Sequence, residues 1–233
     1  MKIPGFGRTG QSKLKVAHVV VAGLGGLGSP ASIYLAAAGI GHITIIDAQR
    51  VELSNLNRHV LHWESDIGQP KVKSATEKLT AMNSNIKVDG VFRQITSENV
   101  GQLIKGADVV VDGLDNYSTR YLLNEACVQN NIPLIHGAVE GLVGQVMTIL
   151  PGKGPCLKCA VPKEPPKKSL FPVLGATPGV IGCLQAMEAI KLITGIGKPL
   201  VGRMLIFNGI DMTFDEMKVN RNPSCQVCGK RGR

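Results

Sequence analysis

Aromatic side chains and long apolar runs are both scarce in this sequence of 233 residues. Only 4% of the residues are Phe, Trp or Tyr, too few for the stacking surface that binds single-stranded nucleic acid. No stretch approaches the ~18 consecutive apolar residues of a membrane-spanning helix, and no apolar run near the start marks a secretory signal. The composition therefore predicts a cytoplasmic protein without nucleic-acid or membrane partners.

Acidic residues are scarce in the last third of the chain. Residues 151–233 hold 13 Lys and Arg against five Asp and Glu, whereas residues 1–150 hold 13 against 12. The C-terminal third therefore carries almost all of the net charge of +9. Such an excess favours an acidic protein or nucleotide as partner, and a solvated basic surface without a partner is the alternative.

Four of the six cysteines form two Cys-x-x-Cys pairs, Cys156 with Cys159 and Cys225 with Cys228. Two thiolates on one tight turn can face the same tetrahedral ion, and two such pairs complete a zinc site with sulfur–metal bonds of ~2.3 Å. A redox pair would not need the second turn, and stable disulfides are disfavoured in the cytosol. The spacing predicts structural Zn²⁺ that ties the C-terminus to the loop after residue 150.

Short apolar segments alternate with helical segments over the first 139 residues. Strands are expected at 17–22, 42–47, 86–92, 107–112 and 133–139, and helices at 26–38, 71–83, 97–104 and 118–130. This order predicts an α/β fold with a Rossmann-like, doubly wound, mostly parallel sheet. Further elements are expected beyond it: a strand at 144–150, a loop at 151–176, a helix at 177–194 and antiparallel strands at 204–207 and 212–219.

A glycine-rich turn follows the first expected strand. Gly23, Gly25, Gly26 and Gly28 stand before the next helix, where the absence of side chains lets the backbone approach a phosphate. Asp47 ends the second strand, where a carboxylate can accept hydrogen bonds from both hydroxyls of a ribose. The pattern predicts an adenine nucleotide, either ATP or NAD; a glycine-rich turn without a ligand is the alternative.

The segment after Asp47 favours ATP. It supplies amides and a guanidinium, and an ammonium opens the next helix: Ser54, Asn55, Leu56, Asn57, Arg58 and Lys71. Two cations suit a triphosphate, because Arg can bind phosphate oxygens in pairs and Lys acts as a point charge. Solvated surface cations are the alternative. His59 and His62 lie close to Arg58, and both packing and phosphate contact remain open for them.

Two further polar residues follow the fourth expected strand at the same edge of the sheet. Asp115 can hold a Mg²⁺ ion bound to the phosphates, and Asn116 stands beside it. The alternative for Asp115 is a carboxylate that closes a turn or caps the following helix.

Taken in order, these motifs resemble the MoeB/ThiF family of adenylyltransferases, relatives of the ubiquitin-activating enzymes. The resemblance rests on residues 23–30, 47, 54–58, 68–71, 115–116, 179–189 and the two cysteine pairs. It implies a homodimer that binds Mg-ATP and adenylates the C-terminal glycine of a small ubiquitin-like sulfur carrier (MoaD/ThiS-like) ending in Gly-Gly, with release of pyrophosphate. It also implies one adenylation domain over 1–233, with a nucleotide-binding half (1–150) and a zinc and carrier-binding half (151–233).

The resemblance also implies residue roles. Gly26 approaches the nucleotide phosphates, Asp47 holds the ribose, and residues 54–58 with Lys71 engage the phosphate tail. Asp115 coordinates magnesium, so that Arg58, Lys71 and Asp115 form the expected catalytic set. The four paired cysteines match the family's structural zinc ligands.

Three departures from the family pattern stand out. Gln49 replaces an aspartate that many relatives carry, and the arginine that relatives carry ahead of the equivalent of Pro4 is absent from the printed sequence. Relatives that form a thioester or persulfide place a cysteine before the equivalent of Phe171, where residues 165–169 read Pro-Pro-Lys-Lys-Ser. We therefore expect the reaction to stop at the acyl-adenylate, which sulfide or a separate sulfurtransferase would consume. An NAD-dependent oxidoreductase and a non-catalytic carrier-binding subunit are the alternatives.

Overall fold

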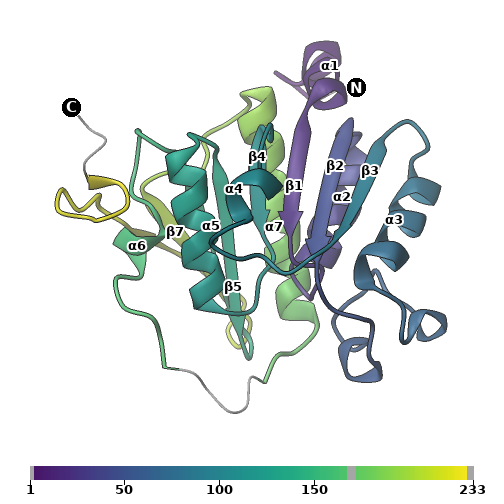
Figure 1. Ribbon diagram of the computed structural model, residues 1–233. Helices are drawn as coiled ribbons and strands as arrows, with labels where there is room; N and C mark the ends of the chain where they lie inside the picture. The colour runs from purple at the N-terminus through teal and green to yellow at the C-terminus, as the bar shows by residue number, and fades with distance from the viewer. Residues whose placement is uncertain (1–2, 167–171, 230–233) are drawn as a thin grey trace.

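One eight-stranded sheet runs through the protein, as a computed structural model that describes residues 3–166 and 172–229 shows (Figure 1). Its strand order is β3-β2-β1-β4-β5-β6-β7-β8. The strands span His18–Ala22 (β1), His42–Asp47 (β2), Lys87–Phe92 (β3), Val109–Asp112 (β4), Leu134–Glu140 (β5), Val143–Ile149 (β6), Arg203–Asn208 (β7) and Thr213–Lys218 (β8). The first five strands are parallel and the last three are antiparallel, which confirms the predicted fold class.

Helices cover both faces of the sheet (Figure 1). They span Gly7–Val16 (α1), Gly28–Ala38 (α2), Lys71–Met82 (α3), Val100–Leu103 (α4), Tyr117–Gln129 (α5), Leu157–Ala160 (α6) and Ala176–Thr194 (α7), with short 3-10 turns at Leu53–Asn55 (η1) and Glu64–Asp66 (η2). None of the helices in the described part of the chain is both long enough and apolar enough to cross a membrane.

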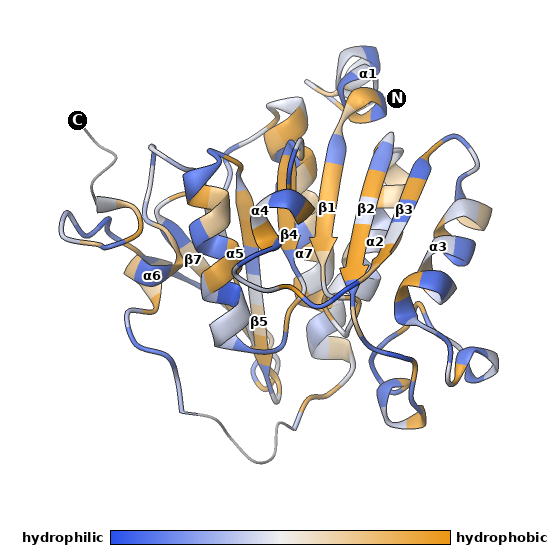
Figure 2. Cartoon of the chain, in the orientation of Figure 1, coloured by the Kyte–Doolittle hydropathy of each residue, from blue (hydrophilic) through white to orange (hydrophobic). Residues whose placement is uncertain are grey.

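The two cores follow from the alternation of side chains along β1. Val19 and Val21 face the core made with α1, α2, α3 and α7, whereas Val20 and Ala22 face the core made with α4, α5 and α6. Apolar residues are concentrated along the parallel strands in Figure 2, as expected for a sheet covered on both sides. The carboxyl ends of the parallel strands therefore meet at one edge, where loops are free to bind a ligand.

Some elements differ from the sequence-based expectation. Helix α1 was not predicted, because only Gly10 and Leu14 of its ten residues are buried and no apolar periodicity results. The helix expected at 97–104 is reduced to the single turn of α4. The loop expected at 151–176 contains α6, which follows the first residue of a cysteine pair, Cys156.

A buried ionic cluster joins the end of β4 to β5 and α5. Asp112 is fully buried; its Oδ2 accepts a hydrogen bond from His136 Nδ1 at 2.8 Å and lies 3.4 Å from Arg120 Nε. Arg120 also donates to the backbone oxygens of Leu114 and Gly137. Burial lowers the pKa of His136, so the carboxylate and guanidinium are the charged pair. The cluster fixes the loop after β4 that carries Asp115.

Replacing Arg120 tests this cluster. Arg120→Leu leaves the buried Asp112 carboxylate without its cationic partner and two carbonyl oxygens without their donor, so we expect the free energy of unfolding to fall by about 3–5 kcal/mol. The matched control is Arg203→Ala, which removes an exposed ion pair with Glu216 and should cost less than about 1 kcal/mol. Urea denaturation measures both; equal losses would contradict the role given to the cluster.

Candidate functional site

The glycine turn between β1 and α2 contains two glycines that the fold itself requires. Gly23 has a φ of +92°, and a Cβ there would lie 2.6 Å from the carbonyl oxygen of Gly113. A Cβ on Gly28 would lie 1.8 Å from the carbonyl oxygen of Gly23. Neither position can carry a side chain, because the backbones of the turn and of the loop after β4 are in contact.

The two glycines inside the turn are not required by the fold in this way. The atom nearest to a Cβ on Gly25 would be His59 Nε2 at 3.5 Å, which is an ordinary contact. A Cβ on Gly26 would meet the side chain of Pro178 at 3.0 Å and that of Arg58 at 3.6 Å. Apart from the His59 ring, no atom lies within 4 Å of the Cβ position on Gly25, so its missing side chain fits a ligand that approaches the backbone closely.

Asp47 links the glycine turn to the end of β2. Its Oδ2 accepts the backbone N–H of Leu24 at 2.8 Å and its Oδ1 accepts that of Gln49 at 2.7 Å. Each carboxylate oxygen can accept a second hydrogen bond, and the side chain is only half-buried. The position and remaining acceptor capacity of Asp47 therefore fit the ribose contact that the sequence predicts.

Lys71 at the start of α3 is 2% exposed, which makes the solvated-cation alternative wrong for this residue. Its Nζ donates to Gln49 Oε1 at 2.6 Å. Burial lowers the pKa of Lys71, the charges of Asp47 and Asp115 among others raise it, and that of Arg58 lowers it further. The charges of Asp47, Asp115 and Arg58 therefore all act on the Lys71 ammonium. The sequence missed that Gln49 is the direct partner of this lysine.

Arg58 is positioned by its own segment. Its Nη1 donates to the carbonyl oxygen of Ser54 at 2.9 Å and to Asn57 Oδ1 at 2.8 Å. Asn55 is buried and its Oδ1 accepts the N–H of Glu52, which fixes the 3-10 turn η1. The other guanidinium N–H groups of Arg58 make no hydrogen bond to a described residue and can still bind an anion. Leu56 is half-buried in the same segment.

Asp115 and Asn116, at the end of the loop between β4 and α5, have different roles. Asn116 caps α5, because its Oδ1 accepts the backbone N–H of Thr119 at 2.9 Å. The helix-cap alternative is therefore wrong for Asp115, which is exposed and accepts one hydrogen bond from Asn116 Nδ2 at 3.2 Å. An exposed carboxylate at the carboxyl edge of the sheet has the donor atoms that Mg²⁺ prefers.

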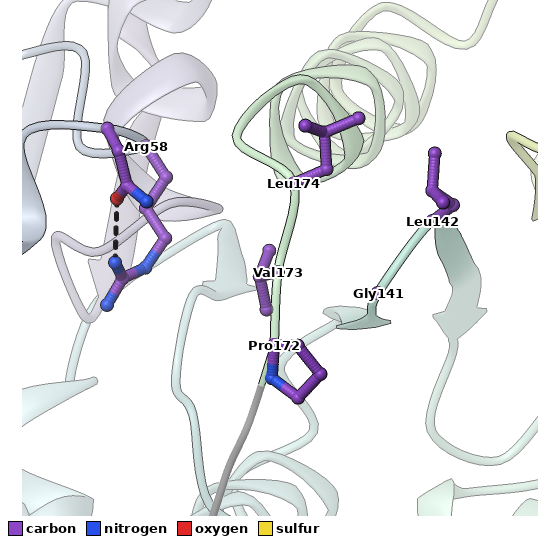
Figure 3. A pocket seen from close by; sticks show the side chains of 7 residues that line it. Arg58, Gly141, Leu142, Pro172, Val173 and Leu174 are labelled. Atoms are coloured by element: carbon purple, nitrogen blue, oxygen red, sulfur yellow. Dashed lines mark hydrogen bonds between the residues drawn. The ribbon is translucent and has the colours of Figure 1, made fainter.

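A pocket of about 550 Å³ lies beside Arg58 (Figure 3). Asn57 also lines it, and the apolar walls come from two distant segments: Gly141, Leu142, Pro172, Val173 and Leu174. The segment 172–175 runs against the Arg58 loop, since a Cβ on Gly175 would lie 2.0 Å from the carbonyl oxygen of Asn57. The sequence did not reveal this pocket, because its lining residues lie up to 117 positions apart.

The four paired cysteines lie together at the other end of the sheet, and all four sulfur atoms are within 4.8 Å of one another. Cys156 Sγ and Cys225 Sγ are 3.7 Å apart, and Cys159 Sγ and Cys228 Sγ are 3.4 Å apart. Tetrahedral bonds of 2.3 Å would separate ligand sulfurs by about 3.8 Å, so the cluster fits Zn²⁺. Four thiolate ligands would leave no position for water, so an ion bound here would be structural.

These features define a doubly wound α/β protein with its candidate ligand site at the carboxyl edge of the parallel strands. A model of the ThiF family matches residues 1–227, and the chain belongs to this family. It is 44% identical to the "SAMP-activating enzyme E1" of Haloferax volcanii, covering 97% of this chain and 85% of that protein. It is 42% identical to the "Sulfur carrier protein adenylyltransferase" of Thermus thermophilus, covering 98% and 88%. A crystal structure of E. coli MccB with ATP superposes with a TM-score of 0.86 at 28% identity, covering 95% and 69%.

Metal analysis tests the cysteine cluster. Protein purified without added zinc should contain about one Zn²⁺ per chain, and removal of the metal should loosen the C-terminal third before nucleotide binding is affected. Cys159→Ser should release the ion, whereas Cys183→Ser, outside the cluster, should retain it. Hydrogen exchange locates the loosened segment. Folded protein with no bound metal would contradict the assignment.

Proposed function

We propose that this protein is an adenylyltransferase that uses Mg-ATP to activate the C-terminal glycine of a ubiquitin-like sulfur carrier, with release of pyrophosphate. Two of its relatives carry the names of a carrier adenylyltransferase and an activating enzyme. The observation that carries the proposal is the buried ammonium of Lys71 at the carboxyl edge of the sheet, on whose charge both Arg58 and Asp115 act.

The nucleotide would lie along the edge from β2 to β4. Asp47 would accept hydrogen bonds from the ribose hydroxyls, and the backbone at Gly25 and Gly26, which carries no side chain, would lie against the phosphates. Lys71 and the free N–H groups of Arg58 would bind the polyphosphate tail. Asp115 would hold Mg²⁺, which supplies further neutralisation of phosphate charge when bound.

The carrier's C-terminal tail would occupy the pocket beside Arg58. An extended Gly-Gly segment has no side chains, so it could lie along the 172–174 segment beside Arg58 (Figure 3). Gly26 would connect this pocket to the nucleotide, because Gly26 belongs to the glycine turn and a Cβ on it would touch Arg58, which lines the pocket, as well as Pro178. The tail would therefore end with its carboxylate next to the phosphates.

The reaction follows from charge. The carrier carboxylate attacks the α-phosphorus of ATP, the bond from this phosphorus to the bridging oxygen of the β-phosphate breaks, and pyrophosphate leaves with that electron pair. An anionic nucleophile meets an anionic centre, so positive charge must stabilise the transition state. Arg58 and Lys71 provide it, and no general base is needed because the nucleophile is already ionised.

The product would be the acyl-adenylate, without a covalent link between enzyme and carrier. Outside the zinc cluster the free cysteines are Cys127 and Cys183, and burial raises the pKa of both thiols. Neither therefore supplies a thiolate at neutral pH. The sequence predicts no nucleophilic thiol in the segment before Phe171. Residues 167–171 lie outside the described part of the chain. Sulfide or a sulfurtransferase would consume the adenylate.

The assembly is part of the same proposal. Tyr34 on α2 and Met187 on α7 expose apolar side chains that a second copy of the chain would cover in a homodimer. The carrier would dock against the zinc-containing half, where Lys163 is exposed and the net charge is positive. Neither alternative, an NAD-dependent oxidoreductase or a non-catalytic subunit, has support comparable to the relatives' names and the two cations.

Pyrophosphate exchange tests the proposed function. Radiolabelled pyrophosphate should enter ATP only when a Gly-Gly-ending ubiquitin-like carrier is present, because adenylation is reversible until the acyl-adenylate is consumed. The same carrier without its last glycine should give no exchange. Absence of exchange with a panel of such carriers, in protein that binds ATP, would favour the non-catalytic alternative.

Lys71 provides a separate test of nucleotide choice. Lys71→Ala should weaken ATP binding by about tenfold or more and AMP binding much less, because the lost charge faces the phosphate tail. Calorimetric titration in the presence of Mg²⁺ measures both affinities. Lys78→Ala, whose ammonium pairs with Asp66, is the control and should change neither. Equal losses for ATP and AMP would show that Lys71 does not meet the tail.

A further inference from the structure

The side chain of His59 is buried at the candidate site and makes no hydrogen bond to a described residue. The residue is 5% exposed, and its Nδ1 is buried with no partner. Its Nε2 makes no hydrogen bond to a described residue and lies 3.5 Å from the position that a Cβ on Gly25 would take. Buried polar atoms without partners are rare in native proteins, and each one calls for an explanation.

Packing alone does not explain His59, as its neighbour shows. His62 is buried to the same extent, and both of its ring nitrogens have partners, Ser74 Oγ at 2.9 Å and the carbonyl oxygen of Leu24 at 3.3 Å. His62 therefore has a structural role. The ring of His59, 6.3 Å away, faces the glycine turn with its hydrogen-bonding capacity unused.

The surroundings of His59 keep its ring neutral. Burial, first of all, and then the charges of Lys71, Arg58 and His62 lower its pKa to about 3. Every charged or titratable group that acts on the ring is thus cationic or neutral. A neutral imidazole carries one N–H and one lone pair.

The burial of Nδ1 decides which nitrogen carries that proton. In native proteins a buried N–H without an acceptor is rarer than a buried acceptor without a donor. The proton is therefore assigned to Nε2, the nitrogen that faces Gly25. This N–H group then lies beside Gly25 in the glycine turn that leads into α2.

We propose that His59 binds the nucleotide, its Nε2–H donating a hydrogen bond to a phosphate oxygen over Gly25 as an uncharged third donor beside Arg58 and Lys71. The inference rests on the proposed function, since it takes the ligand of the turn to be a nucleotide. A third cation at this position would repel the other two in the empty site, whereas a neutral donor adds a hydrogen bond without that cost.

Three variants test the role of His59. His59→Leu should weaken binding of MgATP about tenfold and leave adenosine binding unchanged, since a hydrogen bond to a charged group is lost. His59→Gln places an amide N–H at a similar reach and should restore ATP affinity to within about threefold. The control is His42→Gln at the opposite edge of the sheet, where His42 pairs with Asp89; it should leave both affinities unchanged.

Nuclear magnetic resonance of the ring nitrogens in the unaltered protein tests the proton assignment without a substitution. The His59 signals, identified by their absence in His59→Gln, should show a neutral ring protonated at Nε2 at pH 7, and MgATP should shift the Nε2–H resonance. A charged ring, a proton on Nδ1 or an unshifted resonance would overturn the inference, even if His59→Leu fails to fold.

The binding outcomes separate this inference from the proposed function. Unchanged MgATP affinity in His59→Leu, or an equal loss for ATP and adenosine, overturns the role of His59 and leaves the adenylyltransferase proposal in place. Unaltered protein that binds no MgATP overturns both.

Discussion

The close backbone contact at the glycine turn is the constraint on which the rest of the site depends. A Cβ on Gly28 or Gly113 would clash with the carbonyl oxygen of Gly23, and a Cβ on Gly23 would clash with that of Gly113, so no side chain fits at any of the three. This contact places the start of α2 directly against the ends of β1 and β4. The N–H groups of the turn and the loop that carries Asp115 are consequently next to each other, although 90 residues separate them in the chain.

The charges around this turn are arranged before any ligand binds. The ammonium of buried Lys71 donates a hydrogen bond to Gln49 and is stabilised by the negative charges of Asp47 and Asp115. It is therefore already desolvated and positioned in the unliganded protein. The buried pair of Asp112 and Arg120 fixes the loop after β4, because both side chains are hydrogen-bonded to the backbone of Leu114. Such preorganisation lowers the cost of binding a polyanion, because the side chains lose little further freedom.

The two ends of the sheet have separate tasks. The parallel strands supply the edge that we assign to the nucleotide, and the antiparallel strands β6–β8 extend the sheet toward the cysteine cluster and the pocket wall at Leu142. The cluster ties α6 to the segment after β8 through side chains 69 residues apart. A metal at this point would stabilise the half of the protein that we assign to the carrier, and would leave the nucleotide half independent of it.

Local patterns in the sequence determined the alternation of strands and helices, the glycine turn and the cysteine pairs, because each depends on residues that are near neighbours in the chain. Helix α1 was not predicted, because it has no periodic apolar face and is stabilised by the tertiary packing of Leu14. Only the tertiary structure decided that Gln49 pairs with Lys71, that the 172–174 segment closes a pocket beside Arg58, and that His59 keeps an unpaired nitrogen at the turn. These features depend on contacts between distant segments, whose distances and burial no local pattern encodes.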